Sequence, residues 1–264
     1  MSESEFFSPH GVLLLTGAFV TFASTALGAL PALATRRLTD VQRGALLGFS
    51  AGVMLSAAAF SLITPSFDLI RSQGLLGYSG AFVIGASVLM GAAFIAVLNR
   101  FLPHEHFETG IEGGIPATAL KRVWLFVIAI TLHNFPEGLA VGTGVGSEDI
   151  SIALPILVGI GIQNLPEGFI VAFSLLAVGY RIREAFWVAI LTGIVEAGSA
   201  VLGYIAVTTV SDFLPIALSA AGGAMIYVVS SEMIPESHSK SQSVYTSTGL
   251  MIGFVLMLVI SALF

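Results

Sequence analysis

Two six-residue stretches place the same kinds of polar side chain at the same spacing within long apolar runs. HNFPEG begins at His133, and QNLPEG begins at Gln163. His133 and Glu137 stand four positions apart, so they share one face of a helix, and Gln163 and Glu167 repeat this arrangement. Imidazole, amide oxygen and carboxylate groups on facing helices make a plausible site for a divalent cation.

Each motif also carries a proline and a glycine that bear on helix geometry. Pro136 lacks a backbone N–H and leaves the carbonyl of Leu132 without its usual partner, and Pro166 has the same effect in the second motif. In lipid such a carbonyl is tolerated where a cavity, water or an ion satisfies it. Gly138 and Gly168 are expected to allow close approach of neighbouring helices.

Composition separates this chain from soluble proteins. It has 264 residues, of which 56% are hydrophobic and only 10% charged, with a mean hydropathy of +0.96. Soluble domains carry about 25% charged residues, so a chain with so few charges is an integral membrane protein. The absence of cysteine excludes thiolate metal ligands, and the net charge of −6 is no signature of nucleic-acid binding. The bilayer is the expected partner, and nucleic acid is not.

Apolar runs divide the chain into candidate membrane spans. A spanning helix needs roughly 20 mainly apolar residues, whereas a β-barrel would show alternating segments of about ten residues, which this sequence lacks. We therefore predict an all-α integral membrane protein with a single transmembrane domain over 1–264. Its eight predicted spans cover residues 11–34, 43–64, 78–100, 122–145, 150–178, 184–209, 213–236 and 243–264.

The basic residues indicate the orientation of these spans. Nine of the ten fall in the connections after the first, third, fifth and seventh spans, and only Arg71 follows the second. This bias predicts that odd-numbered connections face the cytoplasm. Both termini are then expected on the non-cytoplasmic side of the cell (inner) membrane. The first ten residues contain no Lys or Arg, so the first apolar run is predicted to be a retained span rather than a signal peptide.

Five acidic residues lie within the apolar spans, whereas no Lys or Arg lies within a span core. A carboxylate at membrane depth costs at least a few kcal/mol and is by default a functional candidate. By the helix rise, His133, Gln163 and Glu196 each lie about 18–20 Å along their spans, near the middle of a core about 30 Å thick. A bound cation is the simplest partner for polar groups that three helices bring to one depth. The five acids are Glu137, Glu167, Glu196, Glu232 and Glu236.

Each of these groups also has a purely structural interpretation. The two motifs could be Pro-kinked packing helices whose polar groups bond each other, since hydrogen bonds between helices are common in membranes. Glu196 could be a protonated carboxyl group bonded to a neighbouring helix. Glu232 and Glu236, with His238 just beyond, could form a solvated helix end or a relay on the cytoplasmic path. Met54 is better explained as core packing when the sequence alone is considered.

The predicted loop over 101–121 contains the run HEHFETGIEGG, which clusters His104 and His106 with three glutamates. Such runs are usually solvated and flexible. Because short tracts of this kind can also bind metal, a cytoplasmic metal-collecting role is the alternative.

Five segments of the chain match a pattern found in known membrane proteins. They are HNFPEG, QNLPEG, AGVMLSAAAFSL in the second span, VEAGSA in the sixth and SEMIPESH in the seventh. Over essentially the whole chain, the sequence resembles the ZIP family of divalent metal transporters, and within it the bacterial, GufA-like branch. The resemblance implies inverted repeats of spans 1–3 and 6–8 around spans 4 and 5, with a site near the midplane. It also implies a homodimer that moves metal into the cytoplasm.

The resemblance further implies a set of ligands. Zinc is the first expected cargo, with cadmium, iron and manganese as further candidates, and no organic cofactor is expected. Many relatives carry His where this chain has Gln163, and some carry Asp where it has Asn164, so two neutral amides lower the charge of the site. One implied metal position uses Met54, His133, Glu137, Gln163 and Glu167 with Glu196 as a further candidate, and the second uses Asn134, Asn164 and Glu196 with Glu137 and Glu167 as bridging ligands.

The expected function is carriage of divalent metal by alternating access. Metal sheds water, displaces protons from carboxylates, and leaves when one helix bundle shifts against the other. A channel with the same ligands along an open pore is the main alternative, although several ligands at one depth favour a stop rather than a fast path. An intramembrane metalloenzyme would want an H-E-x-x-H arrangement, whereas the first motif is H-x-x-x-E and no span contains a second His. The chain is therefore not expected to be an enzyme.

Overall fold

Long helices make up almost all of the described part of the protein. β1 (Glu105–His106) and β2 (Gly110–Ile111) pair antiparallel within the predicted loop over 101–121, and they are a small exception to the helical prediction. The computed structural model describes residues 9–34, 39–75, 77–101, 105–106, 110–111, 119–177, 180–238 and 243–263.

The helices follow the predicted spans, and short 3₁₀ segments (η1, η3) and π-helical segments (η2, η4) join some of them into continuous series. In chain order they are α2 (Pro9–Ala29), η1 (Leu30–Leu33), α3 (Asp40–Ser56), η2 (Ala57–Ile63), α4 (Thr64–Ser72), α5 (Tyr78–Phe101), α6 (Ala119–Gly146), α7 (Ile150–Ala177), α8 (Ile182–Thr209), η3 (Ser211–Phe213), α9 (Leu214–Val228), η4 (Val229–Met233), α10 (Ile234–His238) and α11 (Ser243–Leu263).

Seven segments within the described residues are long and apolar enough to cross a membrane. Each overlaps one predicted span, so the prediction of a multi-pass helical membrane protein is confirmed. The remaining predicted span, 122–145, is the central part of α6, a 28-residue helix that is not among the seven. The seven are Gly11–Leu33, Asp40–Ser72, Tyr78–Leu98, Ile150–Leu176, Ile182–Thr209, Leu214–His238 and Val244–Leu263.

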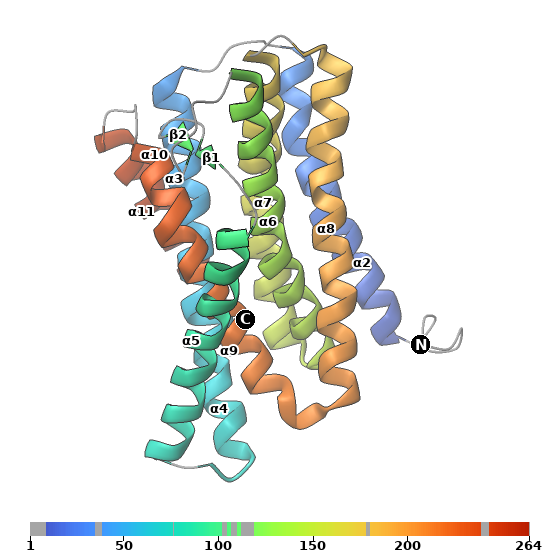
Figure 1. The fold of residues 1–264 in the computed structure, drawn as a ribbon. Coiled ribbons are helices and arrows are strands. Elements are labelled where there is room, and N and C mark those ends of the chain that lie inside the picture. Colours follow the sequence, from blue (N-terminus) through green and yellow to red (C-terminus); the bar gives the residue numbers. More distant parts are fainter. Residues whose placement is uncertain are drawn as a thin grey trace.

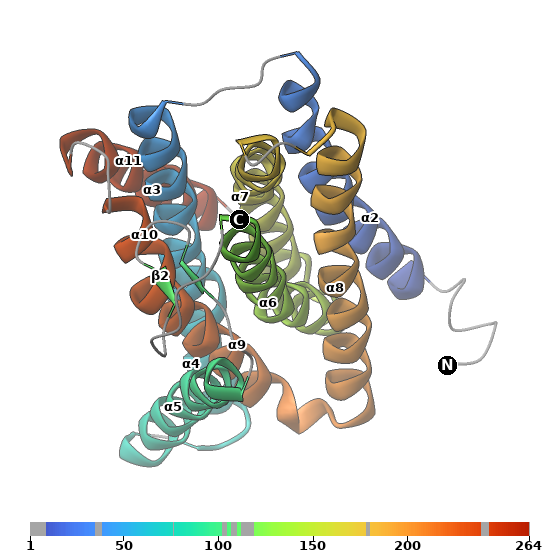
Figure 2. The same cartoon turned by 45° about the horizontal axis from the view of Figure 1, so that its top comes forward.

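The helices form two groups, which Figure 1 and Figure 2 show from two directions. α6 and α7 lie beside α2 and α8, and we call these four helices the motif bundle. The segments from α3 to α5 and from α9 to α11 lie together on the other side of α6 and α7, and we call them the flanking bundle. Both sequence motifs therefore lie in one bundle, along its boundary with the other.

Glycines bring helix backbones together within each bundle. A Cβ built on Gly138 of α6 would lie 2.1 Å from the carbonyl oxygen of Glu196 in α8. A Cβ built on Gly168 of α7 would lie 2.1 Å from the carbonyl oxygen of Thr25 in α2. These contacts confirm the close approach predicted for the two motif glycines. Among the described glycines, none meets the backbone of the other bundle so closely, and side chains form the boundary.

Two π-helical turns lie in the flanking bundle. η2 separates α3 from α4, and η4 separates α9 from α10. A proline follows each of them closely, Pro65 and Pro235. Its ring clashes with the preceding turn and it donates no N–H, so a widened turn accommodates it, and such turns are frequent at functional sites. The second and seventh helical segments consequently extend beyond their predicted ends, to Ser72 and His238.

Candidate metal centre

Both motifs lie in the middle of uninterrupted helices. α6 continues through Pro136, and α7 continues through Pro166. The side chains predicted as midplane ligands are all buried, and none exposes more than 3% of its surface. They are Met54, His133, Asn134, Glu137, Gln163, Asn164, Glu167 and Glu196.

Hydrogen bonds between amides and carboxylates join the two motifs to each other and to α8. Gln163 Nε2 donates to Glu137 Oε1 at 2.6 Å. Asn164 Nδ2 donates to Glu196 Oε2 at 2.8 Å. The carboxylates of Glu137, Glu167 and Glu196 also lie close enough to repel one another electrostatically. Three helices thus bring amides and acids into one buried network.

The two motifs dock on their outer neighbours in the same register. Asn134 Nδ2 donates to the carbonyl oxygen of Thr192 in α8 at 3.0 Å, and Asn164 Nδ2 donates to that of Thr21 in α2 at 3.2 Å. Four positions after Asn134, Gly138 meets the backbone of Glu196, which lies four positions after Thr192. In the same way, Gly168 meets the backbone of Thr25. As a result, α8 presents Glu196 at the position where α2 presents a threonine.

Glu167 is bonded to a residue that the sequence did not single out. Ser50 Oγ of α3 donates to Glu167 Oε1 at 2.9 Å and lies 3.3 Å from the carbonyl oxygen of Gln163. Ser50 stands one turn before Met54 on α3, and both are fully buried. The four-residue spacing from Met54, an expected ligand, is the one feature of the sequence that could have indicated Ser50.

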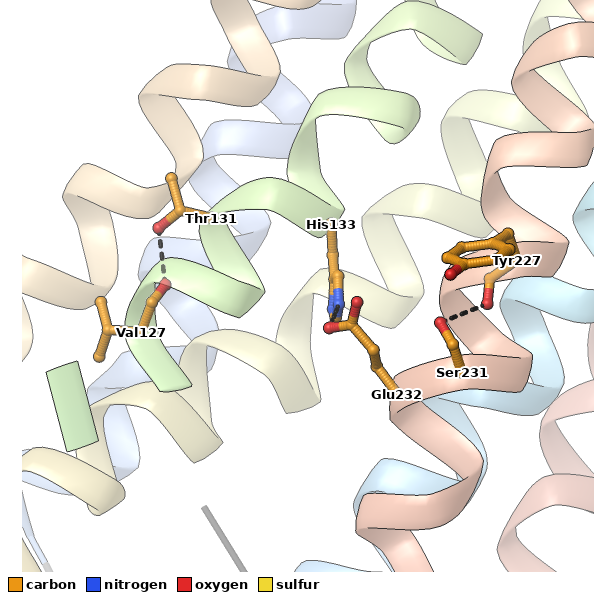
Figure 3. A network of polar contacts seen from close by, with 6 residues as sticks. All are labelled: Val127, Thr131, His133, Tyr227, Ser231 and Glu232. Carbon is orange, nitrogen blue, oxygen red and sulfur yellow. Dashed lines mark hydrogen bonds and ion pairs between the residues drawn. The ribbon is translucent and has the colours of Figure 1, made fainter. Parts of the chain in front are cut away.

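His133 is bonded to the seventh predicted span. Its Nε2 lies 2.6 Å from Glu232 Oε2 in η4, and Figure 3 shows the two side chains pointing toward each other. Glu236, one turn further on, forms an ion pair with Arg43 of α3. Glu232 is 3% exposed and Glu236 is 5% exposed. Both acids are therefore withdrawn from solvent, unlike His238 at the end of the helix, and the relay on the cytoplasmic path stays a prediction.

The other predicted histidines lie apart from this network or outside the described residues. His238 is exposed at the end of α10, where its Nδ1 lies 3.0 Å from the carbonyl oxygen of Ile234. Only the backbone of His106 is described, in β1, and His104 falls outside the described residues. The metal-collecting role of this loop stays a prediction.

Six buried polar atoms of this network have no hydrogen-bond partner among the described residues. Leaving such an atom unpaired costs roughly 1–3 kcal/mol. Five of the six are amide or carboxylate oxygens, which accept hydrogen bonds and can ligate cations. They are Asn134 Oδ1, Glu137 Oε2, Gln163 Oε1, Asn164 Oδ1 and Glu196 Oε1, and the sixth atom is His133 Nδ1.

The acids and histidine do not by themselves form a ready cage. Across the described part of the chain, no group of three or more His, Cys, Asp or Glu side chains is arranged to hold one ion. Gln163 and Asn164 are bonded to two of the carboxylates, so a cation must either displace these amides or use their oxygens. Such an arrangement suits reversible binding better than a permanent structural metal, whose ligands form a closed shell.

Comparison with known proteins points to one family. The family model described as ZIP Zinc transporter matches residues 105–261, more than half of the chain. Zinc transporter GufA of Myxococcus xanthus is 44% identical over 93% of this chain and 96% of its own length. Zinc transporter ZIPB of Bordetella bronchiseptica is 42% identical over 94% of this chain and 80% of its own length. Human zinc transporter ZIP11 is 30% identical over 92% of this chain and 95% of its own length.

All three relatives are named as transporters and none as an enzyme. The matched region contains both motifs, the acid of α8 and the π turn that carries Glu232. The chain belongs to the ZIP family, and its relatives at 42–44% identity are bacterial members of that family.

Proposed function

We propose that the protein transports divalent transition-metal cations, zinc first, across the inner membrane into the cytoplasm. The observation that carries this proposal is the set of buried acceptor oxygens without partners on α6, α7 and α8. No Lys or Arg occurs between Arg122 and Arg181, a stretch that contains both motifs, so a divalent cation is the natural partner of these oxygens. The names of the relatives support zinc, and cadmium, iron and manganese are further candidates because selectivity depends on geometry and availability.

The centre would hold one or two ions. The first position would use His133 and Met54 with the carboxylates of both motifs, and the second would use Asn134 and Asn164 with Glu196. Glu137 and Glu167 would bridge the two ions. The mutual closeness of the three carboxylates supports this sharing, since bound cations would relieve their repulsion.

The protein would cross the membrane eight times, with α6 as the additional span and both termini on the non-cytoplasmic side. Inverted repeats of spans 1–3 and 6–8 are supported by paired packing in the flanking bundle. A Cβ on Gly52 of α3 would lie 2.0 Å from the carbonyl oxygen of Leu250 in α11. A Cβ on Gly223 of α9 would lie 2.0 Å from that of Val88 in α5. The π turns in the corresponding series, η2 and η4, add to this likeness.

Transport would proceed by alternating access, with the motif bundle moving against the flanking bundle. Among the described glycines, none meets the backbone of the other bundle closely, and this supports the division. Glu232, Glu236 and His238 would receive the ion on the cytoplasmic side, together with the loop that contains His104 and His106. A homodimer is expected, with exposed apolar side chains of α5 and α11 available to lipid or a second copy.

Uptake of radioactive zinc into proteoliposomes tests this function. A carrier predicts uptake that saturates with zinc concentration and that competing divalent metals inhibit. A current that does not saturate and follows the membrane voltage would favour a channel instead. Absence of metal uptake by well-folded protein would refute transport.

A further inference from the structure

Ser50 places a buried hydroxyl on the boundary between the two bundles. It lies on α3 of the flanking bundle and is 0% exposed. Its Oγ is 2.9 Å from Glu167 Oε1 and 3.3 Å from the carbonyl oxygen of Gln163. Both acceptors are on α7 of the motif bundle, so the hydroxyl reaches a proposed metal ligand from the opposite side of the boundary.

The hydroxyl of Ser50 cannot donate a full hydrogen bond to both acceptors at the same time. A serine hydroxyl has one proton to donate. The contact with the Glu167 carboxylate is the shorter of the two. The hydroxyl therefore donates its hydrogen bond to Glu167 Oε1, and the backbone oxygen of Gln163 is a second, weaker acceptor within reach.

We propose that Ser50 is a positioning residue that sets the metal affinity of the centre by changing its hydrogen-bond partner when metal binds. This inference rests on the proposed function. In the cargo-free protein the hydroxyl holds Glu167 Oε1. When a divalent cation takes that oxygen, the hydroxyl rotates to the carbonyl oxygen of Gln163, so that no buried donor is left unpaired.

This exchange has two consequences for transport. The cation competes with this buried hydrogen bond, so the centre binds metal less tightly than its carboxylates alone would. Metal binding also replaces the strong contact between α3 and α7 with a weaker one to the backbone. Ser50 therefore favours release of the cargo and loosens the boundary between the bundles when the centre is loaded.

Ser50→Ala removes the hydroxyl from both states. Loss of the stronger of the two contacts from the cargo-free state corresponds to about a five-fold change in affinity. We therefore expect the KM for zinc to fall about five-fold. The maximal rate should fall as well, because bound metal leaves more slowly. A purely structural role would lower the rate without tightening zinc binding.

The experiment compares zinc uptake by proteoliposomes with equilibrium zinc binding to the detergent-solubilised full chain. Ser219→Ala is the matched control, because Ser219 is equally buried but donates at 2.7 Å to the carbonyl oxygen of Pro215 in its own helix. Ser50→Thr and Ser50→Val form a second pair. Their new side chains have similar shapes, but only threonine keeps a hydroxyl. The threonine variant should resemble the wild type, and the valine variant should resemble alanine.

An unchanged KM and an unchanged zinc affinity in Ser50→Ala would overturn the proposal. A rise in KM would overturn it too, because the hydroxyl would then help to hold the metal rather than compete with it. If the wild type takes up no metal, the proposed function fails. If the wild type transports zinc and the variants without a hydroxyl match it, only the role of Ser50 is lost.

Discussion

His133 Nε2 and Glu232 Oε2 lie 2.6 Å apart, and this contact crosses from the motif bundle to the flanking bundle. His133 opens the first motif, whereas Glu232 lies in the π turn η4. A histidine ligates metal through a neutral ring nitrogen, so in the proposed centre a cation that binds Nε2 would separate this pair, whereas a cation that binds the unpartnered Nδ1 would leave it intact. Glu232 would compete with a cargo ion bound at Nε2, and in either case its carboxylate would lie beside the proposed centre, where it could receive the ion next.

Glu232→Gln keeps a hydrogen-bond partner for His133 but removes the charge. We expect the maximal rate of zinc uptake to fall about ten-fold, a loss typical of residues adjacent to metal ligands, because the side chain no longer attracts the departing cation. The KM should not rise, since glutamine holds His133 less strongly. Initial rates in proteoliposomes measure both. Asp212→Asn, which alters an exposed carboxylate in η3, should leave both constants unchanged, and a wild-type rate in Glu232→Gln would contradict the relay.

Glu137→Ala removes a carboxylate proposed to bridge two ions. It also leaves Gln163 Nε2 without its acceptor at 2.6 Å. Zinc uptake is expected to fall by about 100-fold or more, because even residues adjacent to metal ligands can be worth that much. Glu137→Gln tests whether charge or bonding matters. Size-exclusion chromatography and thermal unfolding should establish that each variant is folded, and near-normal uptake by a folded alanine variant would remove Glu137 from the ligand set.

Gly138→Ala should force α6 away from α8. The added Cβ would lie 2.1 Å from the carbonyl oxygen of Glu196 and 2.0 Å from Ser199 Oγ. Overpacking of this kind typically costs about 1–3 kcal/mol, and it displaces an acid of the centre, so thermal stability and uptake should fall together. Gly198→Ala is the control in α8, because a Cβ there meets no atom within 4 Å. Equal melting temperatures for the two variants would show that the contact at Gly138 is not tight.

Burial and helical face could be predicted from the sequence because both follow from local spacing, whereas the common membrane depth stays a prediction. The helix rise put His133, Gln163 and Glu196 at one depth, and the structure buries all three. The motif glycines were expected at close helix contacts and are found there. The hydrogen bonds between amides and carboxylates in the network are also those expected from the structural interpretation, in which the polar groups of the motifs bond each other.

Lateral neighbours could not be predicted, because the spacing within a helix does not show which distant helix packs against it. Glu232 is 99 positions from His133, and Ser50 is 117 positions from Glu167. The ion pair between Arg43 and Glu236 was missed for the same reason, since Arg43 was assigned to a connection. Apolar length also gave no sign of the π turns, so two helical segments extend further than expected.

Gln163→His tests the first departure from the family pattern. Imidazole is a better zinc ligand than an amide oxygen, and a ring nitrogen can still donate to Glu137. We expect zinc affinity to rise about ten-fold, the effect of roughly 1.4 kcal/mol, and the maximal rate of uptake to fall because release slows. Competition between zinc and manganese in uptake measures the change in preference. An unaltered preference would show that position 163 does not face the metal.

Asn164→Asp tests the second departure through stability. Asn164 Nδ2 donates to Glu196 Oε2 at 2.8 Å and to the carbonyl oxygen of Thr21 at 3.2 Å. An aspartate side chain here has no N–H to donate, and it would place a second carboxyl group against Glu196. The cargo-free variant should therefore be less stable than the wild type by about 1–3 kcal/mol. A divalent cation between the two acids would reverse this repulsion.

Zinc should consequently raise the unfolding temperature of Asn164→Asp more than that of the wild type, because a ligand stabilises the folded state in proportion to how tightly it binds there. Calcium at the same concentration is the control, since a cation that only screens charge should act on both proteins alike. Equal zinc-induced shifts would show that position 164 lies outside the coordination sphere. A larger shift in the variant would mean that the wild-type amide weakens metal binding at Glu196 and so makes release of the metal easier.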